Sequence, residues 1–480
     1  MCFIDIIIQG NIFMKKTIAA ILAIIMMISL SSCAVIRINL RVYEKPEQME
    51  TNPYYRVWVR PQGYVEYTEL PCYESATPFV TFDYDFEVPI EVKIEYGASS
   101  FMERAYILPT SAEIETQVDN KTVTFWMDKP EKISVEFSLR RSINLFVFAN
   151  AIEDESQVPD PDTQDPNILY YGPGYHEVGH LELKSNQTLY LAGGAVLDAY
   201  ITATDAENVK ILGRGIITGK NYTAERHRII NFIRCNNVYV EGITLLDSNA
   251  WTFVTEYCKD VTITDIKEVC DGLNSDGFDI CSSENVLIDN VFVRNHDDNI
   301  SIKAFNGIPS KNITMQNSVL FTTAAHNMLV GPEAKPGADG ESIVFDQITF
   351  KNIDVIRNET QSGTFCGVMA IMACDNSITQ NVTWENIRID RSIAPMIHFS
   401  YTDAYSTIGI GKKIQNITVK NVQTCAESRT AWIFGYDEAH TIDNVKLYDL
   451  YNGDKKLTIE SGFIQTQFAD VEEFFTDSQS

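Results

Sequence analysis

Three aspartates and one histidine recur at the same point of successive short segments of the chain. Asp276, the pair Asp297 and Asp298, and His326 each stand directly before a run of residues that is typical of a β-strand. Counted through Asp298, the steps are 22 residues (298 − 276) and 28 residues (326 − 298). If each step is one turn of a solenoid, the four side chains share one face, with neighbouring strands about 4.8 Å apart.

Carboxylates that close repel one another unless a proton is shared or a substrate requires them. Cleaving a glycosidic bond requires one carboxylic acid to protonate the leaving oxygen and one carboxylate to activate water or attack the sugar. Crowding serves both needs, because it raises the pKa of one carboxyl while another stays ionised. A structural explanation, in which each aspartate only caps a turn, accounts for any one of these residues but poorly for all of them together.

The elements that would position these residues form an internal repeat from about residue 168 onward. Each unit begins with a polar residue, usually Asn or Asp, and continues with alternating β-branched and polar residues. The units begin at Asn208, Asn237, Asp260, Asn285, Asn312, Asn381, Asn416 and Asn444. The first four spacings are 29, 23, 25 and 27 residues, and short strands that recur at such intervals are typical of a solenoid.

No helical periodicity accompanies these strands, which argues against a leucine-rich horseshoe. The fold class that we predict is all-β, a right-handed parallel β-helix preceded by a small β-sandwich. The asparagines would stack into a ladder at the turns, and each coil would bury an inward row of Val, Ile and Leu. Cys235 and Cys258 occupy matching points of two repeats, which favours stacked inward thiols.

The chain divides into four parts. Residues 1–33 are typical of a signal segment, residues 37–150 show short alternating runs broken by turn residues, and residues 151–167 are rich in Pro and Asp. We interpret the second part as the β-sandwich and the third as a linker. The β-helix would then occupy residues 168–470.

Composition excludes some classes of function. The 480-residue chain is 45% hydrophobic and has a formal net charge of −27. It can bury a large core, and its negative charge argues against a nucleic-acid partner, because phosphate binding needs a basic surface. Its ten cysteines include no CxxC pair and no Cys/His spacing of a zinc site. We therefore expect neither a metal nor a cofactor.

The N-terminal segment predicts export. Lys15 and Lys16 precede an apolar run over residues 18–30, and small residues follow before Cys33. This pattern resembles a bacterial lipoprotein signal, with Cys33 as the lipidated residue. The predicted location is periplasmic or at the cell surface, with membrane attachment only through the lipid. A plain secretory signal or a signal-anchor helix is the alternative, and the sequence leaves the oligomeric state open.

Three further residues are candidates for substrate binding. Trp251 could stack on a sugar ring, since aromatic faces suit apolar sugar faces, or pack between coils. Glu333 flanks the predicted site in sequence, and its alternative role is that of an ordinary exposed loop residue. His398 would line the groove if its side chain points outward from its strand, and otherwise has a structural role.

The strings around Asp276 (Asn274 to Asp279), around the aspartate pair (Asp297 to Lys303) and at His326 resemble the polygalacturonase-like glycoside hydrolases of family 28. The resemblance covers roughly residues 168–450 and implies a pectin-lyase-like β-helix that acts on a polysaccharide or oligosaccharide. The preceding β-sandwich resembles the dextranase and isopullulanase family 49, which adds such a domain to the same β-helix.

Residue by residue, the resemblance implies an inverting hydrolase. It makes Asp297 the general acid, and Asp276 and Asp298 the carboxylates that hold and activate the attacking water. His326 would support the acid and contact substrate. Asn274 belongs to the matching string and would contact substrate, and Lys303 could reach a sugar hydroxyl or carboxylate.

The chain departs from the family pattern in ways that bear on the substrate. The family's Gly-His-Gly is Ala325-His326-Asn327 here, which predicts a bulkier groove floor, and Asn299 replaces a cysteine. The Arg-x-Lys expected in the next coil is absent from residues 367–372. A neutral or differently charged glycan is therefore expected at least as much as a galacturonate polymer. The segment 226–228, Arg-His-Arg, could supply a compensating charge or form an exposed loop.

Two alternative functions remain open at this point. A polysaccharide lyase on the same fold would need a cation and a basic residue as the proton acceptor, and the expected residues are missing from the coil pattern. A non-catalytic carbohydrate-binding β-helix would use the long groove of a solenoid. Binding alone has little use for the crowded carboxylates.

Overall fold

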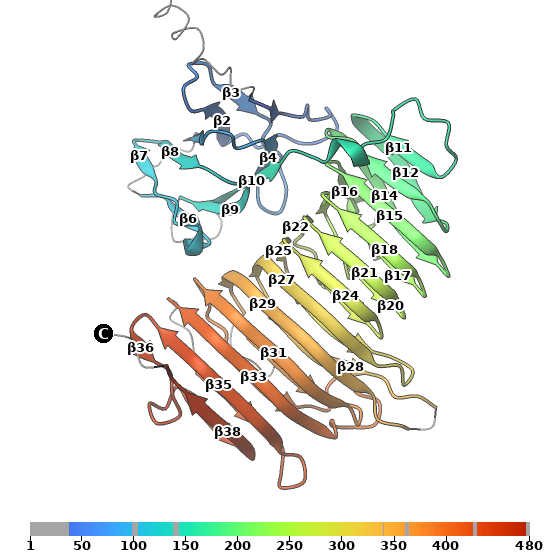
Figure 1. Cartoon of the computed structure of the whole chain (residues 1–480), viewed down its shortest axis with the longest axis vertical. Helices are drawn as coiled ribbons and strands as arrows, with labels where there is room; N and C mark the ends of the chain where they lie inside the picture. The colour runs from blue at the N-terminus through green and yellow to red at the C-terminus, as the bar shows by residue number, and fades with distance from the viewer. Residues whose placement is uncertain are drawn as a thin grey trace, which may run out of the picture.

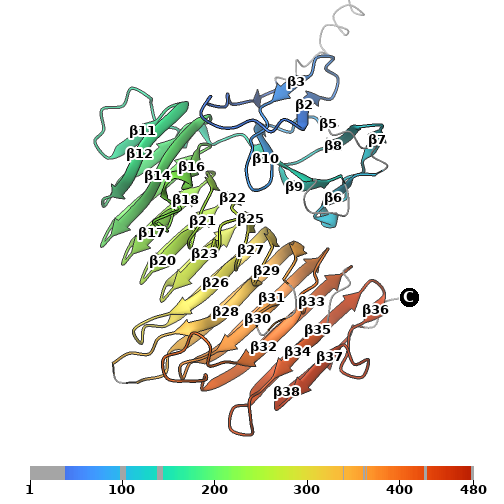
Figure 2. The same ribbon diagram turned by 180° about the vertical axis from the view of Figure 1, so that it is seen from behind.

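The computed structural model describes residues 38–97, 104–137, 144–338, 340–360, 363, 365–425 and 430–476. This part of the chain forms a small β-sandwich beside one long stack of parallel strands (Figures 1 and 2). The predicted fold class is confirmed. Cys33 lies outside the described residues. Among the described residues, no helix has the length and apolarity that crossing a membrane requires.

Two five-stranded sheets form the sandwich and enclose a hydrophobic core of their own. The first sheet has the order β1 (Leu40–Arg41), β4 (Phe79–Tyr84), β10 (Asn144–Ala151), β9 (Glu131–Glu136) and β6 (Tyr106–Leu108). The second has the order β3 (Thr68–Leu70), β2 (Tyr55–Pro61), β5 (Ile90–Tyr96), β8 (Thr122–Met127) and β7 (Gln117–Asp119). Short 3-10 helices η1 (Thr110–Ala112) and η2 (Glu155–Gln157) lie in the connections.

The β-helix has three faces, each a ladder of parallel strands from successive coils. The first face consists of β11 (Ile168–Tyr171), β13 (Thr188–Leu191), β15 (Glu207–Gly213), β18 (Asn236–Glu241), β21 (Lys259–Thr264), β24 (Glu284–Asp289), β27 (Ser310–Thr322), β29 (Val344–Asn358), β31 (Ile378–Ile389), β33 (Lys413–Thr424), β35 (Ile442–Asn452) and β38 (Ala469–Phe474). The second face consists of β12 (Gly174–Leu183), the first half of β14 (Ala195–Thr204), β16 (Ile216–Thr218), β19 (Thr244–Leu246), β22 (Lys267–Val269), β25 (Phe292–Asn295) and the later residues of β27, β29, β31, β33 and β35.

The third face begins in the later residues of β12, continues in the second half of β14 and carries the site described below. It continues through β17 (Ile230–Ile233), β20 (Phe253–Glu256), β23 (Phe278–Cys281), β26 (Ile300–Ala304), β28 (His326–Ala334), β30 (Gly367–Ala373), β32 (Ile397–Tyr401), β34 (Ala431–Phe434) and β37 (Ile464–Gln467). The 3-10 helix η3 (Lys220–Tyr222) precedes β17, and the two-residue β36 (Lys455–Lys456) pairs with β35.

Asparagine side chains form the predicted ladder along the first face. The amide of Asn237 donates to Asn208 at 2.7 Å, and the amide of Asn312 donates to Asn285 at 2.8 Å. All eight repeat positions named above have left-handed backbones, with φ between 52° and 57°. Asn and Asp adopt this conformation more readily than other non-glycine residues, which explains why the repeat begins with them.

Apolar side chains fill the interior of the coils from Leu183 to Ile464 in one continuous core. Cys235 and Cys258 belong to it, and the Cys235 N–H donates to the Cys258 sulfur at 3.4 Å, as expected for stacked inward thiols. Each fully buried Val, Leu or Ile contributes about 1.5–3 kcal/mol. The inward rows therefore hold the coils in a fixed register.

Aromatic side chains fasten the sandwich to the second face of the β-helix. Phe146 and Phe148 of β10 make edge contacts with Phe292 of β25, at ring-centroid distances of 4.7 and 5.2 Å. Buried polar contacts surround them, including the Arg214–Asp83 ion pair at 3.2 Å. Both views show the sandwich against the N-terminal half of the stack (Figures 1 and 2).

Phe292→Ala tests this interface between the sandwich and the β-helix. Removing a fully buried phenyl ring between two cores is expected to cost about 3–5 kcal/mol of unfolding free energy, because the cavity cannot collapse around fixed strands. Denaturant unfolding measures this loss. The control, Tyr436→Ala, removes a ring that is 60% exposed and should change the same free energy by about 0.5 kcal/mol or less; equal losses in the two variants would contradict the assignment.

Candidate active site

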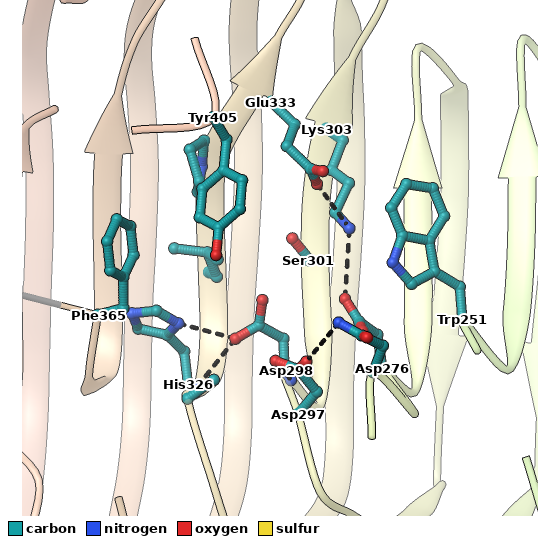
Figure 3. A pocket seen from close by; sticks show the side chains of 14 residues that line it. Trp251, Asp276, Asp297, Asp298, Ser301, Lys303, His326, Glu333, Phe365 and Tyr405 are labelled. Atoms are coloured by element: carbon teal, nitrogen blue, oxygen red, sulfur yellow. Dashed lines mark hydrogen bonds and ion pairs between the residues drawn. The ribbon is translucent and has the colours of Figure 1, made fainter. Parts of the chain in front are cut away.

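The predicted catalytic side chains lie at the turn that leads from the second to the third face. Asp276 stands between β22 and β23, Asp297 and Asp298 stand between β25 and β26, and His326 begins β28. Because β23 pairs with β26 and β26 with β28, the three turns are stacked on consecutive coils. Figure 3 shows the four side chains directed toward one pocket.

Close packing and buried amides fix the geometry of these turns. A Cβ at Gly277 would lie 2.4 Å from the carbonyl oxygen of Asn299, so the coil spacing here requires glycine. Asn327 donates to Asn299 at 2.7 Å, and Asn358 donates to Asn327 at 2.8 Å. All three asparagines are buried. Asn327 is therefore a step of an internal ladder, and the expectation that it makes the groove floor bulkier is wrong.

The pocket is a cavity of about 120 Å³ at the centre of the third face. Its lining residues are Trp251, Asn274, Asp276, Asp297, Asp298, Ser301, Lys303, Ala325, His326, Leu329, Pro332, Glu333, Phe365 and Tyr405. One oxygen from each of the three aspartates lies within 4.8 Å of the others. The spacing of the repeat thus produces the predicted carboxylate cluster.

Asp297 and Asp298 have different hydrogen-bond partners. Oδ1 of Asp298 contacts the Nδ1 atom of His326 at 2.7 Å and accepts the His326 backbone N–H at 2.9 Å. Asp297 accepts the backbone N–H of Asp298 at 3.1 Å and the amide of Asn274 at 3.4 Å. His326 therefore holds Asp298, the second residue of the pair, whereas the sequence resemblance had assigned it to the acid, Asp297.

A buried lysine connects the cluster to two further carboxylates. Nζ of Lys303 lies 3.3 Å from Asp276, 2.6 Å from Asp279 and 2.8 Å from Glu333. It also lies 3.5 Å from the ring centroid of Trp251. Burial by itself lowers the pKa of Lys303, but the three carboxylates outweigh burial and hold this pKa well above its usual value. Lys303 is therefore a permanent cation.

Burial raises the pKa of Asp297 to about 7; the Asp298 carboxylate adds to the shift and Lys303 opposes it. Burial also raises the pKa of Asp276, with Lys303 opposing and the other two aspartates adding. Such close carboxyls titrate as one unit. We place a shared proton on Asp297, because Asp276 is in direct contact with the ammonium of Lys303, which stabilises its carboxylate.

Several buried polar atoms of this site lack a hydrogen-bond partner among the described residues. They include Oδ1 of Asp276, Oγ of Ser301 and Nε2 of His326, and all three residues line the pocket. Buried polar groups in folded proteins are almost always paired. Their convergence on one cavity favours a bound molecule with hydroxyl groups as the missing partner.

Glu268 of β22 lies behind the cluster and is fully buried. Its Oε1 atom accepts the hydroxyl of Thr252 at 3.1 Å. Burial raises the pKa of Glu268 well above its usual value, with the charges of Asp276 and Asp279 adding to the shift and Thr252 opposing it. Burial therefore favours the neutral form of Glu268, which supports the turn through Thr252.

The structure does not bring every candidate into the pocket. His398 is buried on β32, with Nδ1 2.7 Å from the carbonyl oxygen of Cys366 and its ring edge-on to Trp432. Burial lowers its pKa to about 4. His398 supports the backbone beside Phe365, which does line the pocket, so its position fits the structural alternative.

Two other candidates have specific partners. The ring of Trp251 contacts Lys303 and also Arg228, whose guanidinium carbon lies 4.7 Å from the ring centroid. Glu333 lies within β28 and ion-pairs with Lys303, so the alternative of an exposed loop residue is wrong. Arg226, from the inserted loop, donates to Asn274 at 2.7 Å. Asn274 lines the pocket, whereas Arg226 does not.

Sequence reasoning missed several residues of the site, among them five with polar or aromatic side chains. Asp279, Ser301 and Glu268 belong to strands. Asp279 follows Phe278 and Ser301 follows Ile300, and because side chains alternate along a strand, this order could have indicated that both polar side chains point away from the core. Phe365 and Tyr405 come from loops after β29 and β32, and their rings make an edge contact with centroids 5.4 Å apart. No repeat pattern marks these loop residues.

The three aspartates are also the residues that could hold a metal ion, since each offers an oxygen within 4.8 Å of the others. A hard cation such as Ca²⁺ takes about six to eight oxygen ligands. Lys303 already neutralises part of this acidic charge. The absence of a metal requirement stays a prediction, and a chelator tests it below.

Comparison with known proteins identifies the family of this chain. Residues 182–462, more than half of the chain, match the model of the glycosyl hydrolases family 28. This chain belongs to that family. A probable polygalacturonase of Arabidopsis thaliana is 28% identical over 162 residues, which cover 32% of this chain and 34% of the relative. A probable endo-xylogalacturonan hydrolase A of Neosartorya fischeri is 30% identical over 182 residues, or 34% of this chain and 43% of the relative.

The family 28 chain thus matches less than half the length of these two relatives. Among solved structures, Dex49A from Penicillium minioluteum is similar with a TM-score of 0.69 at 16% identity, over 91% of this chain and 97% of that one. This similarity concerns the fold. It extends over both the sandwich and the β-helix, as the resemblance to family 49 implied.

Asp297→Asn should stabilise the protein at neutral and alkaline pH. The folded-state pKa of about 7 exceeds the unfolded value of about 3.9, so ionisation costs stability as pH rises through this range and the cost is complete above pH 7. The variant should gain about 2–4 °C in Tm at pH 8 and much less at pH 4. Calorimetry at both values, with Asp346→Asn on the outer ladder as control, measures the effect. A gain at pH 4 as large as that at pH 8 would refute the electrostatic cause.

Proposed function

We propose that this family 28 protein hydrolyses O-glycosidic bonds in a polysaccharide or oligosaccharide with inversion at the anomeric carbon. The observation that carries the proposal is the cluster of three aspartates whose oxygens lie within 4.8 Å in one pocket. Two of them have pKa values raised by burial and mutual repulsion. Such a set supplies an acid and a base at the same pH.

Asp297 is the general acid in this mechanism. It is the most exposed of the three aspartates, so it can reach the leaving oxygen and be reprotonated from solvent. With a pKa of about 7 it is largely protonated below neutral pH. As the bond from C1 to the glycosidic oxygen breaks, the Asp297 proton passes to that oxygen, and the leaving sugar departs as an alcohol.

Asp276 and Asp298 hold the attacking water. Their oxygens lie within 4.8 Å of each other, so one water molecule can donate a hydrogen bond of about 2.8 Å to each of them. The water oxygen forms the new bond to C1 while one carboxylate takes its proton, so the net reaction adds one water across the glycosidic bond. His326 orients Asp298, and Lys303 favours the ionised form of Asp276.

Carboxyl separation is a standard guide to stereochemistry, with about 5–5.5 Å in retaining enzymes and about 6.5–9.5 Å in inverting ones. The present cluster is nearer the first range at its closest oxygens. Here two carboxylates converge on one point, which suits capture of a water better than attack by a single carboxylate. We therefore propose inversion, and the anomer of the first product decides it.

The two relatives are named as a polygalacturonase and a xylogalacturonan hydrolase, but the next coil of this chain does not support a uronate. On β30, Ala370 pairs with Leu329 on the outward side, and Met372 follows two residues later. The Arg-x-Lys expected from the sequence resemblance is therefore replaced by apolar side chains. A neutral glycan is the substrate class that we propose.

The alternative functions have less support. A lyase needs a free basic side chain near the substrate, and Lys303 already faces three carboxylates. A binding protein would have no reason to bury Asp276 and Asp298 side by side, since desolvating charge is costly. Neither alternative explains the pKa shift of Asp297.

We also propose that the protein is an exported bacterial lipoprotein, periplasmic or on the cell surface, with Cys33 as the lipidated residue. The basic, apolar and small-residue pattern before Cys33 supports this. A surface location would place the pocket in contact with polymers outside the cell.

Asp297→Asn tests the proposed reaction. The variant should lose about 10²–10⁴-fold in kcat, because a proton donor is removed while the fold is kept. Release of reducing sugar from polygalacturonate, rhamnogalacturonan, dextran and pullulan measures it, with NMR of the first product giving the anomer. Asp346→Asn should keep full activity, and chelator should have no effect. An Asp297→Asn variant with near-normal turnover would remove Asp297 from the role of acid.

Cys33→Ser tests the anchor. In a bacterial host supplied with a radiolabelled or alkyne-tagged fatty acid, the full-length protein should become labelled and sediment with membranes. The variant should lose both the label and the sedimentation. A wild-type protein that is exported without label would overturn the lipid anchor and favour a plain secretory signal.

A further inference from the structure

Lys303 is the one lysine or arginine among the described residues that line the pocket. Three carboxylates, from Asp276, Asp279 and Glu333, lie within 3.3 Å of its Nζ atom. The side chain is only 3% exposed. The charge of the cation that could pair with an acidic substituent of the substrate is therefore already balanced by carboxylates of the protein itself.

Glu333 differs from the other two partners because it lies in a β-bulge of strand β28. In the pairing of β26 with β28, Ile302 faces Val330 and Ala304 faces Ala334. Residues 331–333 thus stand opposite the single residue Lys303. This bulge bends the strand over the lysine, and β-bulges commonly redirect a side chain in this way beside active sites.

The backbone at Glu333 also shows that its position is specified. Its φ of 64° lies in the left-handed region, which a glutamate adopts only rarely. Its side chain is 26% exposed and reaches the pocket from the solvent side, whereas Asp279 is wholly buried and Asp276 is 5% exposed. Glu333 is therefore the partner nearest to where a sugar enters.

We propose that Glu333 is an internal carboxylate that takes the place on Lys303 which an acidic group of a sugar would occupy. The pocket would then select a neutral sugar, with a hydroxymethyl or methyl group at this position, and reject a uronide. This specificity role rests on the proposed hydrolase function and extends it to a named residue.

Charge and surface around the pocket agree with this role. A uronate carboxylate that entered would meet the carboxylates of Asp298 and Glu333, while the charge of Lys303 is already balanced by its own carboxylates, and like charges that close are strongly unfavourable. Apolar and aromatic side chains also line the pocket, including Leu329 and Pro332. Phe365 lies on the side of the pocket away from Trp251 (Figure 3). Such side chains suit the C–H groups of a neutral sugar ring.

Glu333→Gln tests the proposal with a matched pair of ligands, trigalacturonate and its carboxyl-reduced form, which keeps the same rings and linkages. Calorimetry at pH 7.5 gives the affinity of wild type and variant for each. Wild type should prefer the reduced form. In the variant, the ratio of uronide to neutral affinity should rise about ten- to hundredfold, since one negative charge is removed and Lys303 loses one of its three ion-pair partners.

Glu385→Gln is the matched control, because Glu385 is 27% exposed, pairs with Lys420 at 3.1 Å and lies on β31, away from the pocket. Its ligand preference should equal that of wild type. If wild type binds neither ligand, gain of trigalacturonate binding by Glu333→Gln supports the proposal and its absence refutes it. A wild type that prefers the uronide, or a variant with an unchanged ratio, also refutes it.

These binding results are separate from the proposed reaction. Failure of hydrolysis would appear as inactivity of the wild type on every glycan tested with Asp297→Asn. Failure of the specificity role would appear in the affinity ratio of a protein that remains active. A Tm within about 2 °C of wild type confirms that Glu333→Gln is folded.

Discussion

The spacing between parallel coils, about 4.8 Å, is the constraint on which the site depends. It brings Asp276 beside the neighbouring pair Asp297 and Asp298, and one oxygen from each of the three lies within 4.8 Å of the others. Such a cluster is tolerated only with a counter-charge, and Lys303 supplies it from the same face. The proposed roles follow from two contacts: Asp276 touches Lys303, which favours its ionised form as a base, and Asp297 is the aspartate most exposed to solvent, which suits an acid.

The rest of the molecule keeps this spacing rigid. Internal amides at Asn299, Asn327 and Asn358 bond coil to coil directly behind the catalytic turns. The sandwich fastens the opposite side of the same coils through Phe146 and Phe292. Catalysis by preorganised charge requires such rigidity, because a shift of one ångström changes both proton transfer and the position of the water.

Sequence and structure agree where a periodic rule governs the residue. The asparagine repeat predicted the ladder at Asn208 and Asn237, and the one-coil steps predicted that Asp276 and Asp298 would meet. Agreement ends where contacts come from outside the repeat. Glu333, which pairs with Lys303, lies in a β-bulge, and Phe365 and Tyr405 lie in loops. Neither the bulge nor the loops follow the sequence repeat.

By itself the sequence determined the solenoid, its register and the presence of a carboxylate cluster, because a strict alternation of inward and outward residues leaves one solution for each coil. Only the tertiary structure decided how charge is shared in that cluster. It showed that His326 holds Asp298, that His398 faces a backbone carbonyl, and that Glu333 closes the coordination of Lys303. These outcomes depend on distances between side chains of different coils and on burial, and neither quantity is encoded in local pattern.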